Sequence, residues 1–432
     1  MHYKYYIIIL LINILSANVD EYISLINNNL MMGKFLDATV IFDKAVLEYD
    51  SNAELYYVGA QLSIKMDNLD QANKYFLQAI KLDKKNEKYR NELQELAEFK
   101  DALNKVRKTF DSGLIDDSIN EYEKLAEKYP EHAIVFYNLG LIYKVSEEYD
   151  LAVENYHTAQ ALNPFEKKYS LAVKAIAQIS AKEGDEEYRR QEFDSAIKNY
   201  QKAIFYYPEY TTAMFKLART YYKLKDFENA RIYLEQGLSV DPKQEKFEKM
   251  LGDVCKRMGA LEEAVSHYNQ AIEINSNYNQ AFYSLGSLYL GEGKLNEARE
   301  ALNNAILIEP TYIKAYGTLG TIEQELGNID IAIQNFSKAL EYDPKAFDIH
   351  YRLSSAYNIK KQYKNAKLSA KESLNIKRNY APAFYELGLA EMNLCNIYAA
   401  KDALEKAKKD RNFRREASAY LKNIDYYTKD CN

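Results

Sequence analysis

The chain has 432 residues, with 57 basic side chains against 63 acidic ones and a formal net charge of −6. Its 15 glycines and 7 prolines are too few for a turn-rich β-sandwich or a collagen, and 47% hydrophobic residues argue against intrinsic disorder. The three cysteines, Cys255, Cys395 and Cys431, exclude a disulfide scaffold, and no Cys-x-x-Cys pair is present to hold zinc.

The first seventeen residues have the three-part pattern of a secretory signal peptide. A short basic start, Met1–Lys4, precedes an almost unbroken apolar run from Tyr5 to Leu15, and Leu15-Ser16-Ala17 forms a cleavage site. This run of eleven residues makes about 16 Å of helix, short of the ~30 Å hydrocarbon core, so a spanning helix is the weaker interpretation. The bulky Leu15 leaves an uncleaved amino-terminal anchor as an alternative. We expect an exported protein, periplasmic or secreted, with envelope association as a further alternative.

From residue 19 onward, the sequence repeats with a fixed period. A small residue recurs along the chain, and its last seven occurrences are 34 residues apart. The small residues are Ala38, Ala72, Ser118, Ala152, Ala196, Ala230, Ala264, Ala298, Ala332, Ala366 and Ala400. An aromatic or aliphatic residue follows most of them four positions later, and six of the seven prolines keep related spacings. A period this regular predicts a rod-like solenoid and not a set of globular domains.

Each period contains the pattern of two helices. In one of them, Phe136, Leu139 and Tyr143 share one helical face, and Ala152 and Tyr156 share the next. Small residues allow two antiparallel helices to approach closely, and the aromatic residues fill the remaining space. Glycine or asparagine between the helices ends the first one, and proline ends the second.

These residues resemble the tetratricopeptide repeat, whose pattern is W-x2-L-G-x2-Y…A-x3-F…P over 34 residues. The resemblance covers Val19 to Arg414 in eleven repeats and implies an all-α fold, a right-handed superhelical α-solenoid of antiparallel helix pairs. We expect a signal peptide at 1–17, repeats one and two at 19–86, a helical insertion at 87–98, repeats three and four at 99–166, a second helical insertion at 167–176, repeats five to eleven at 177–414 and a capping helix at 415–432.

The sequence contains no recognisable catalytic or metal-binding motif. Its five histidines, His2, His132, His157, His267 and His350, occupy unrelated repeat positions and are expected to lie far apart in a rod-like stack. Cys255 and Cys395 have no base placed near them by the pattern, so we interpret both as structural or incidental. We therefore predict no enzyme activity, no cofactor and no metal site.

Charge is distributed unevenly over the positions that the family turns toward its concave groove. In repeats five to seven, cations outnumber the carboxylates Asp185 and Asp253, and three aromatic side chains lie among them. This basic cluster comprises Lys182, Arg189, Lys216, Arg219, Lys223, Lys246, Lys249, Lys256 and Arg257, with Tyr188, Phe215 and Tyr222. The alternative to a ligand-binding groove is an ordinary solvent-exposed helix face, because lysine is common on any helix surface.

The sequence favours a non-enzymatic interaction module that binds a protein or peptide segment, acidic in one interpretation, in its concave groove. One alternative is a structural scaffold of an envelope or surface assembly that uses its convex face and ends. Another is an accessory subunit of a glycan-processing or lipid-trafficking enzyme. The net charge of −6 opposes nucleic acid as a general partner.

Overall fold

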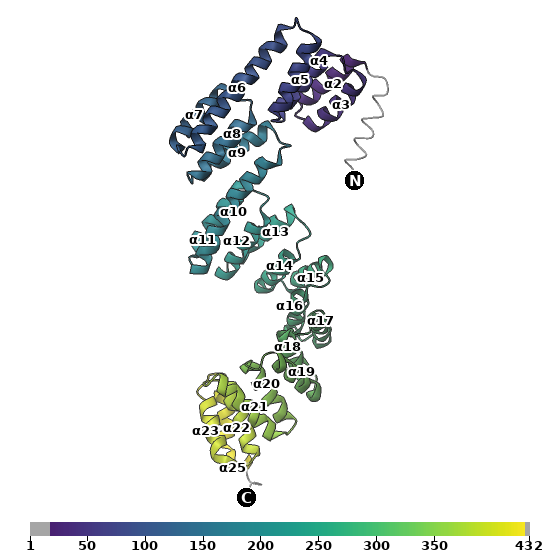
Figure 1. Cartoon of the computed structure of the whole chain (residues 1–432). Helices are drawn as coiled ribbons and strands as arrows, with labels where there is room; N and C mark the ends of the chain where they lie inside the picture. The colour runs from purple at the N-terminus through teal and green to yellow at the C-terminus, as the bar shows by residue number, and fades with distance from the viewer. Residues whose placement is uncertain (1–17, 428–432) are drawn as a thin grey trace. The chain divides into compact units, whose positions relative to one another are not determined.

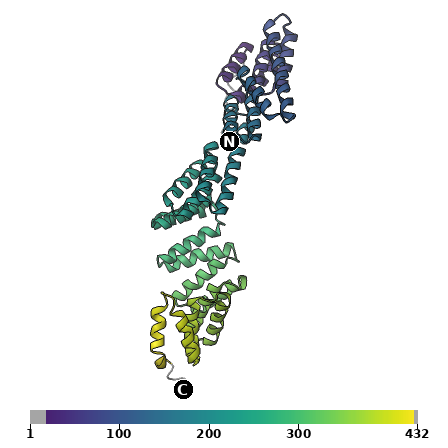
Figure 2. The same ribbon diagram turned by 90° about the vertical axis from the view of Figure 1, so that its left-hand side faces the viewer.

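The computed structural model describes residues 18–427, so the expected signal peptide at 1–17 lies outside the described residues. The chain divides into two compact units, residues 1–213 and 214–432. All regular structure within residues 18–427 is helical, and consecutive helices pack as antiparallel pairs (Figures 1 and 2). The predicted all-α fold, an α-solenoid of helix pairs, is confirmed.

The described residues of the first unit, 18–213, form five helix pairs before a further helix begins. Their helices are α2 (Val19–Met31), α3 (Phe35–Glu48), α4 (Ala53–Lys65), α5 (Leu69–Leu82), α6 (Glu87–Asp111), α7 (Ile115–Lys128), α8 (Ala133–Val145), α9 (Tyr149–Leu162), α10 (Lys167–Arg190) and α11 (Phe193–Tyr206). Helix α12 (Thr211–Leu224) begins in the first unit and continues into the second.

The second unit continues the same alternation of first and second helices. Its helices are α13 (Phe227–Val240), α14 (Glu245–Met258), α15 (Leu261–Ile274), α16 (Asn279–Gly291), α17 (Leu295–Ile308), α18 (Ile313–Glu325), α19 (Ile329–Tyr342), α20 (Phe347–Ile359), α21 (Tyr363–Ile376), α22 (Ala381–Asn393), α23 (Ile397–Ala407), α24 (Arg414–Lys422) and α25 (Ile424–Tyr427).

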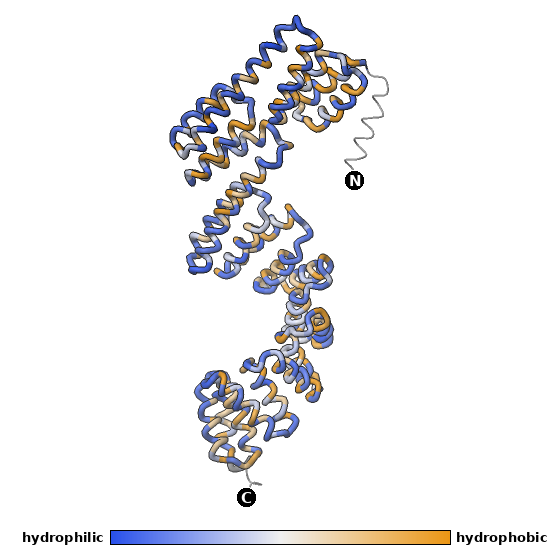
Figure 3. The backbone as a smooth tube through the Cα atoms, viewed as in Figure 1, coloured by the Kyte–Doolittle hydropathy of each residue, from blue (hydrophilic) through white to orange (hydrophobic). Residues whose placement is uncertain are grey.

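Glycine on the first helix and a large ring on the second explain how closely a pair packs. Tyr268 of α15 is fully buried, and a Cβ atom added to Gly252 of α14 would lie 2.5 Å from its ring. The same relation joins Gly320 to Phe336, where the distance would be 2.6 Å. Hydrophobic residues recur along the helices in step with this packing (Figure 3). These glycines of the first helices are therefore contact points where the two helices of a pair approach closely.

A residue in the left-handed conformation ends the first helix of many pairs. Gly259, which follows α14, has φ +84° and donates its amide hydrogen to the carbonyl of Lys256. Glycine suits this position because it has no Cβ atom to clash at positive φ. Other repeats place a residue with a side chain there, such as Asp67 with φ +56°.

The first unit also contains contacts that a rod-like stack does not have. The Asp67 carboxylate accepts hydrogen bonds from the hydroxyl of Tyr169, at the start of α10, and from Asn163 Nδ2 at 3.1 Å. The rings of Phe35 and Phe165 meet edge to face, with centroids 6.0 Å apart. In this unit, repeats that are not sequence neighbours therefore also touch one another.

Two long helices contain the segments that interrupt the sequence period. Residues 87–98 form the first half of α6, which has 25 residues, and residues 167–176 form the start of α10, which has 24. Other first helices have 13 or 14 residues. No helix among residues 18–427 combines the length and apolar character that crossing a bilayer requires.

Two short helices cover the last pair of the second unit. Ala417 of α24 is fully buried with Leu404 and Ala407, and Ile424 of α25 packs with Met392. The sequence predicts one helix over 415–432, whereas the structure breaks the helix at Asn423. The remaining expected residues, 428–432, lie outside the described part of the chain.

Candidate functional site

The first helices of successive pairs lie side by side in the second unit. Helix α14 contacts α16, and the same contact joins α16 to α18, α18 to α20 and α20 to α22. We call the surface that these first helices share the inner surface of the stack. The first helices therefore line one continuous surface, on which side chains from different repeats can face the same ligand.

The predicted basic cluster is divided between the two units. Helix α10 of the first unit carries Lys182, Tyr188 and Arg189, and both cations are exposed. Helices α12 and α14 carry the remaining members, which lie in the second unit. These are Phe215, Lys216, Arg219, Tyr222 and Lys223 on α12, and Lys246, Lys249, Lys256 and Arg257 on α14.

Aromatic and cationic side chains connect α12 with α14. The Nε atom of Arg257 donates a hydrogen bond to the hydroxyl oxygen of Tyr222 at 3.2 Å, and this bond raises the pKa of the guanidinium. The rings of Phe215 and Phe247 lie 5.1 Å apart between the same two helices. The neighbouring Lys223 and Lys256 are exposed. In this part of the cluster, cationic side chains lie beside the aromatic rings of Phe215 and Tyr222. Such a surface is chemically suited to an anionic group attached to an apolar segment.

Lys249 differs from the other cations because it has an internal partner. Its Nζ atom lies 2.6 Å from Asp253 Oδ2, one turn along α14. The Tyr268 hydroxyl donates to the other oxygen of Asp253 at 2.8 Å. Burial, followed by the Asp253 carboxylate, raises the pKa of Tyr268, so the phenol stays protonated as a donor. Lys249 therefore offers less free charge to a ligand than the sequence predicts.

A cavity of about 580 Å³ lies on the first helices of the first unit. Its walls come from α2, α4, α6 and the turn before α8, with Leu96 and Phe99 among the apolar residues and Glu92, Glu95 and Glu131 among the acidic ones. Sequence reasoning missed this cavity, although Glu92, Glu95 and Leu96 belong to the segment 87–98 that interrupts the period.

The cavity has fixed polar groups. The Tyr57 hydroxyl donates to Glu92 Oε1 at 2.5 Å, and Gln61 Nε2 donates to the same hydroxyl at 2.6 Å. His132 is buried, its ring stacks on Phe99 with centroids 3.9 Å apart, and burial lowers the pKa of its imidazole. Chemically, this lining suits an apolar group that carries a hydrogen-bond donor.

Three family models match the chain. One described as "Tetratricopeptide repeat" matches residues 103–167, 181–244 and 318–374. A second with the same description matches 53–86 and 280–312, and one described as "TPR repeat" matches 252–293. The chain belongs to the tetratricopeptide repeat family. Repeats of this family are generally non-enzymatic scaffolds that bind protein or peptide partners.

Individual proteins resemble parts of this tetratricopeptide repeat chain. The BBSome complex member BBS4 of Bos taurus is 28% identical over 149 residues, which are 34% of this chain. The chain spans 26% of the length of that curated relative. The crystal structure of MamA is 30% identical, covers 38% of this chain and 95% of its own, and has a TM-score of 0.35. The structure of PilF of Pseudomonas aeruginosa is 16% identical, covers 48% of this chain and 96% of its own, and has a TM-score of 0.44.

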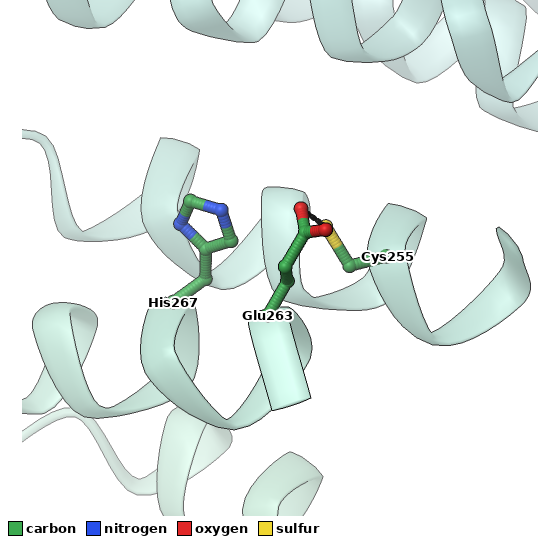
Figure 4. A group of neighbouring side chains, drawn as sticks. All are labelled: Cys255, Glu263 and His267. Atoms are coloured by element: carbon green, nitrogen blue, oxygen red, sulfur yellow. Dashed lines mark hydrogen bonds between the residues drawn. The ribbon is translucent and has the colours of Figure 1, made fainter. Parts of the chain in front are cut away.

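The tetratricopeptide repeat fold also brings together a cluster of potential metal ligands that sequence reasoning missed. One ligand atom from each of Cys255, Glu263 and His267 lies within 4.8 Å of the others (Figure 4). Glu263 and His267 are four residues apart on α15, and Cys255 lies on the preceding α14. The i,i+4 spacing of Glu263 and His267 could have indicated a pair of metal ligands on one helix face. The position of Cys255 beside that pair, however, depends on how α14 and α15 pack.

Proposed function

We propose that this protein binds an acidic protein or peptide segment on the inner surface of its stack, with no chemistry of its own. The members of the basic cluster on α12 and α14 would provide the charge, and Phe215 and Tyr222 would provide apolar contact. The observation that carries the proposal is the hydrogen bond between Arg257 and Tyr222, because it places a guanidinium and an aromatic ring from successive first helices on one surface.

The net charge of the chain supports this location. The chain carries −6 overall, so an acidic ligand is repelled by most of the surface and attracted by the basic cluster. The exposed cations Lys223 and Lys256 keep their solvation, and their interaction with a ligand is therefore screened by salt. Binding should weaken as ionic strength rises.

The test measures the affinity of a fluorescently labelled peptide rich in glutamate and leucine. Each exposed ion pair contributes up to about 1 kcal/mol, so Lys223→Glu combined with Lys256→Glu should weaken binding roughly 10- to 30-fold. The matched control is Lys364→Glu with Lys371→Glu, which reverses two exposed charges on the second helix α21. Equal losses in the two double variants would show a general charge effect and would contradict binding at the cluster.

We also propose that the protein is exported, with residues 1–17 as its signal peptide. The proposal is supported by the three-part pattern of this segment: a basic start, an apolar run from Tyr5 to Leu15 and a cleavage site at Leu15-Ser16-Ala17. Mass spectrometry of the protein from its native source should find a mature amino terminus near Asn18. An intact Met1 on the native protein would contradict cleavage.

A further inference from the structure

We propose that Cys255, Glu263 and His267 form a binding site for a divalent cation of the zinc class between α14 and α15. The proposal is independent of partner binding, because it concerns the contact between the two helices of one pair, where Cys255 is buried, His267 is half-buried and Glu263 is exposed. Its residues supply one sulfur, one oxygen and one nitrogen donor, the three donor types that proteins use for zinc.

The spacing of the donor atoms fits a single small cation. Cys255 Sγ lies 3.9 Å from Glu263 Oε2, and the ligand atoms of all three residues lie within 4.8 Å of one another. Zinc bonds of about 2.0–2.3 Å in tetrahedral geometry place donors roughly 3.5 Å apart. The three side chains therefore need to close by less than about 1.5 Å, and the fourth position is left for water.

The backbone holds these residues in place before any ion binds. Cys255 is fully buried in the last turn of α14, and Glu263 and His267 occupy one face of α15, four residues apart. The turn at Gly259, with φ +84°, joins the two helices and sets their register. A cation bound here would link both helices of the repeat, so binding should stabilise this pair.

A buried carboxylate orients the histidine for metal binding. Glu248 Oε2 lies 2.8 Å from Nδ1 of His267, and Glu248 is only 9% exposed. In Figure 4 a ring nitrogen of His267 faces Glu263. When Nδ1–H donates to Glu248, Nε2 keeps its lone pair for the cation. A carboxylate bonded to the second ring nitrogen is the usual support of a metal-binding histidine.

Arg231 is a positively charged side chain beside the site and would repel a bound cation. Its guanidinium lies 3.0 Å from Glu263 Oε2 and 2.7 Å from Glu235 Oε1. Glu235 keeps Arg231 paired when Glu263 turns to the metal. Glu235 and Glu263 pair with the guanidinium, and Glu248 adds a third carboxylate beside His267. Coordination also releases the Cys255 thiol proton to water and adds a thiolate, so the site has enough negative charge for a dication.

The experiment titrates the full chain, without a histidine tag, with Co²⁺ and then Zn²⁺. We expect one Co²⁺ per chain with a thiolate-to-cobalt charge-transfer band, which Zn²⁺ abolishes by displacement. Cys255→Ser should remove the band, and His267→Gln should weaken binding at least tenfold. Glu248→Gln should weaken it about 10- to 100-fold, the range for loss of a supporting group. His157→Gln, a change of an exposed histidine on α9, is the matched control and should bind normally.

A variant expected to bind more tightly keeps the test independent of folding defects. Arg231→Gln releases Glu263 from its ion pair, so its affinity for Co²⁺ should rise severalfold. Circular dichroism should show unchanged helix content in each variant. The proposal is overturned if the wild-type chain gives no thiolate band, if the band persists in Cys255→Ser, or if Arg231→Gln binds no more tightly. These outcomes leave the affinity for the acidic peptide untouched.

Discussion

Gly252→Ala tests whether the glycines of the first helices are contact points of the helix pairs. The added Cβ atom would lie 2.5 and 2.6 Å from two ring carbons of Tyr268, whereas carbon atoms in good contact are separated by about 3.5–4.0 Å. The ring has little freedom to turn away. It is fully buried, and its hydroxyl is held by Asp253 at 2.8 Å. Either the ring or the α14 backbone must therefore move by about 1 Å.

Two opposing contributions set the size of the effect. Overpacking a core costs about 1–3 kcal/mol, and replacing a helical glycine by alanine returns up to about 1 kcal/mol. Because Tyr268 is fixed at both ends, we expect a net loss of about 1–2 kcal/mol. The control is Gly291→Ala at the end of α16, where no heavy atom lies within 4 Å of the added Cβ. The control variant should gain roughly 0.5–1 kcal/mol from helix propensity alone.

Native-state hydrogen exchange of the full chain measures this difference locally. In Gly252→Ala, the slowest amides of α14 and α15 should exchange about 5- to 30-fold faster, since 1.4 kcal/mol corresponds to a factor of ten. In Gly291→Ala, the amides of α16 should exchange more slowly. Equal protection of α14 in the wild type and in Gly252→Ala would refute the explanation of the period by close helix contact.

Three further changes test other parts of the structure. Burial raises the pKa of Glu386 above its ordinary value of 4.5, so the folded state holds this proton more tightly than the unfolded state does. The folded state therefore loses stability as the pH rises through the folded pKa. Glu386→Gln should remove this loss and raise the melting temperature at neutral pH, with no gain at acidic pH. Tyr169→Phe leaves Asp67 without its phenol donor and should cost about 1–3 kcal/mol, measured by urea unfolding; no loss would mean that the contact is incidental. Ala417→Glu places a carboxylate in the buried contact between α24 and the last helix pair, and light scattering should then show aggregation. A monomeric variant with an unchanged melting temperature would show that α24 is not a cap.

The fold class could be predicted from the sequence because each repeat contributes the same local information. In one repeat, the spacing of Gly252, Ala264 and Tyr268 predicts one close contact between the two helices. Small and large residues recur at the same spacing in other repeats along the chain. A period repeated this often averages out the substitutions in single repeats. The division into eleven repeats and the sites placed on them stay predictions.

The contacts that the sequence did not predict depend on geometry beyond one period. The Asp67 carboxylate meets Tyr169 across 102 residues, a pairing that no local pattern encodes. Lys249 has the spacing of a groove cation, but its i,i+4 neighbour Asp253 pairs with it. Cys255 reaches Glu263 only because α14 and α15 pack at one particular register. Local spacing therefore predicted the elements, and tertiary packing decided which side chains meet.

The location of a bound acidic peptide tests the central claim most directly. A photo-crosslinking phenylalanine derivative can replace Tyr222 on the inner surface of the second unit, or Leu368, which is 63% exposed on the second helix α21. Irradiation with the labelled glutamate- and leucine-rich peptide should crosslink the chain carrying the probe at position 222, and 1 M salt should reduce the yield. Crosslinking at position 368 that equals or exceeds that at 222 would contradict binding on the inner surface.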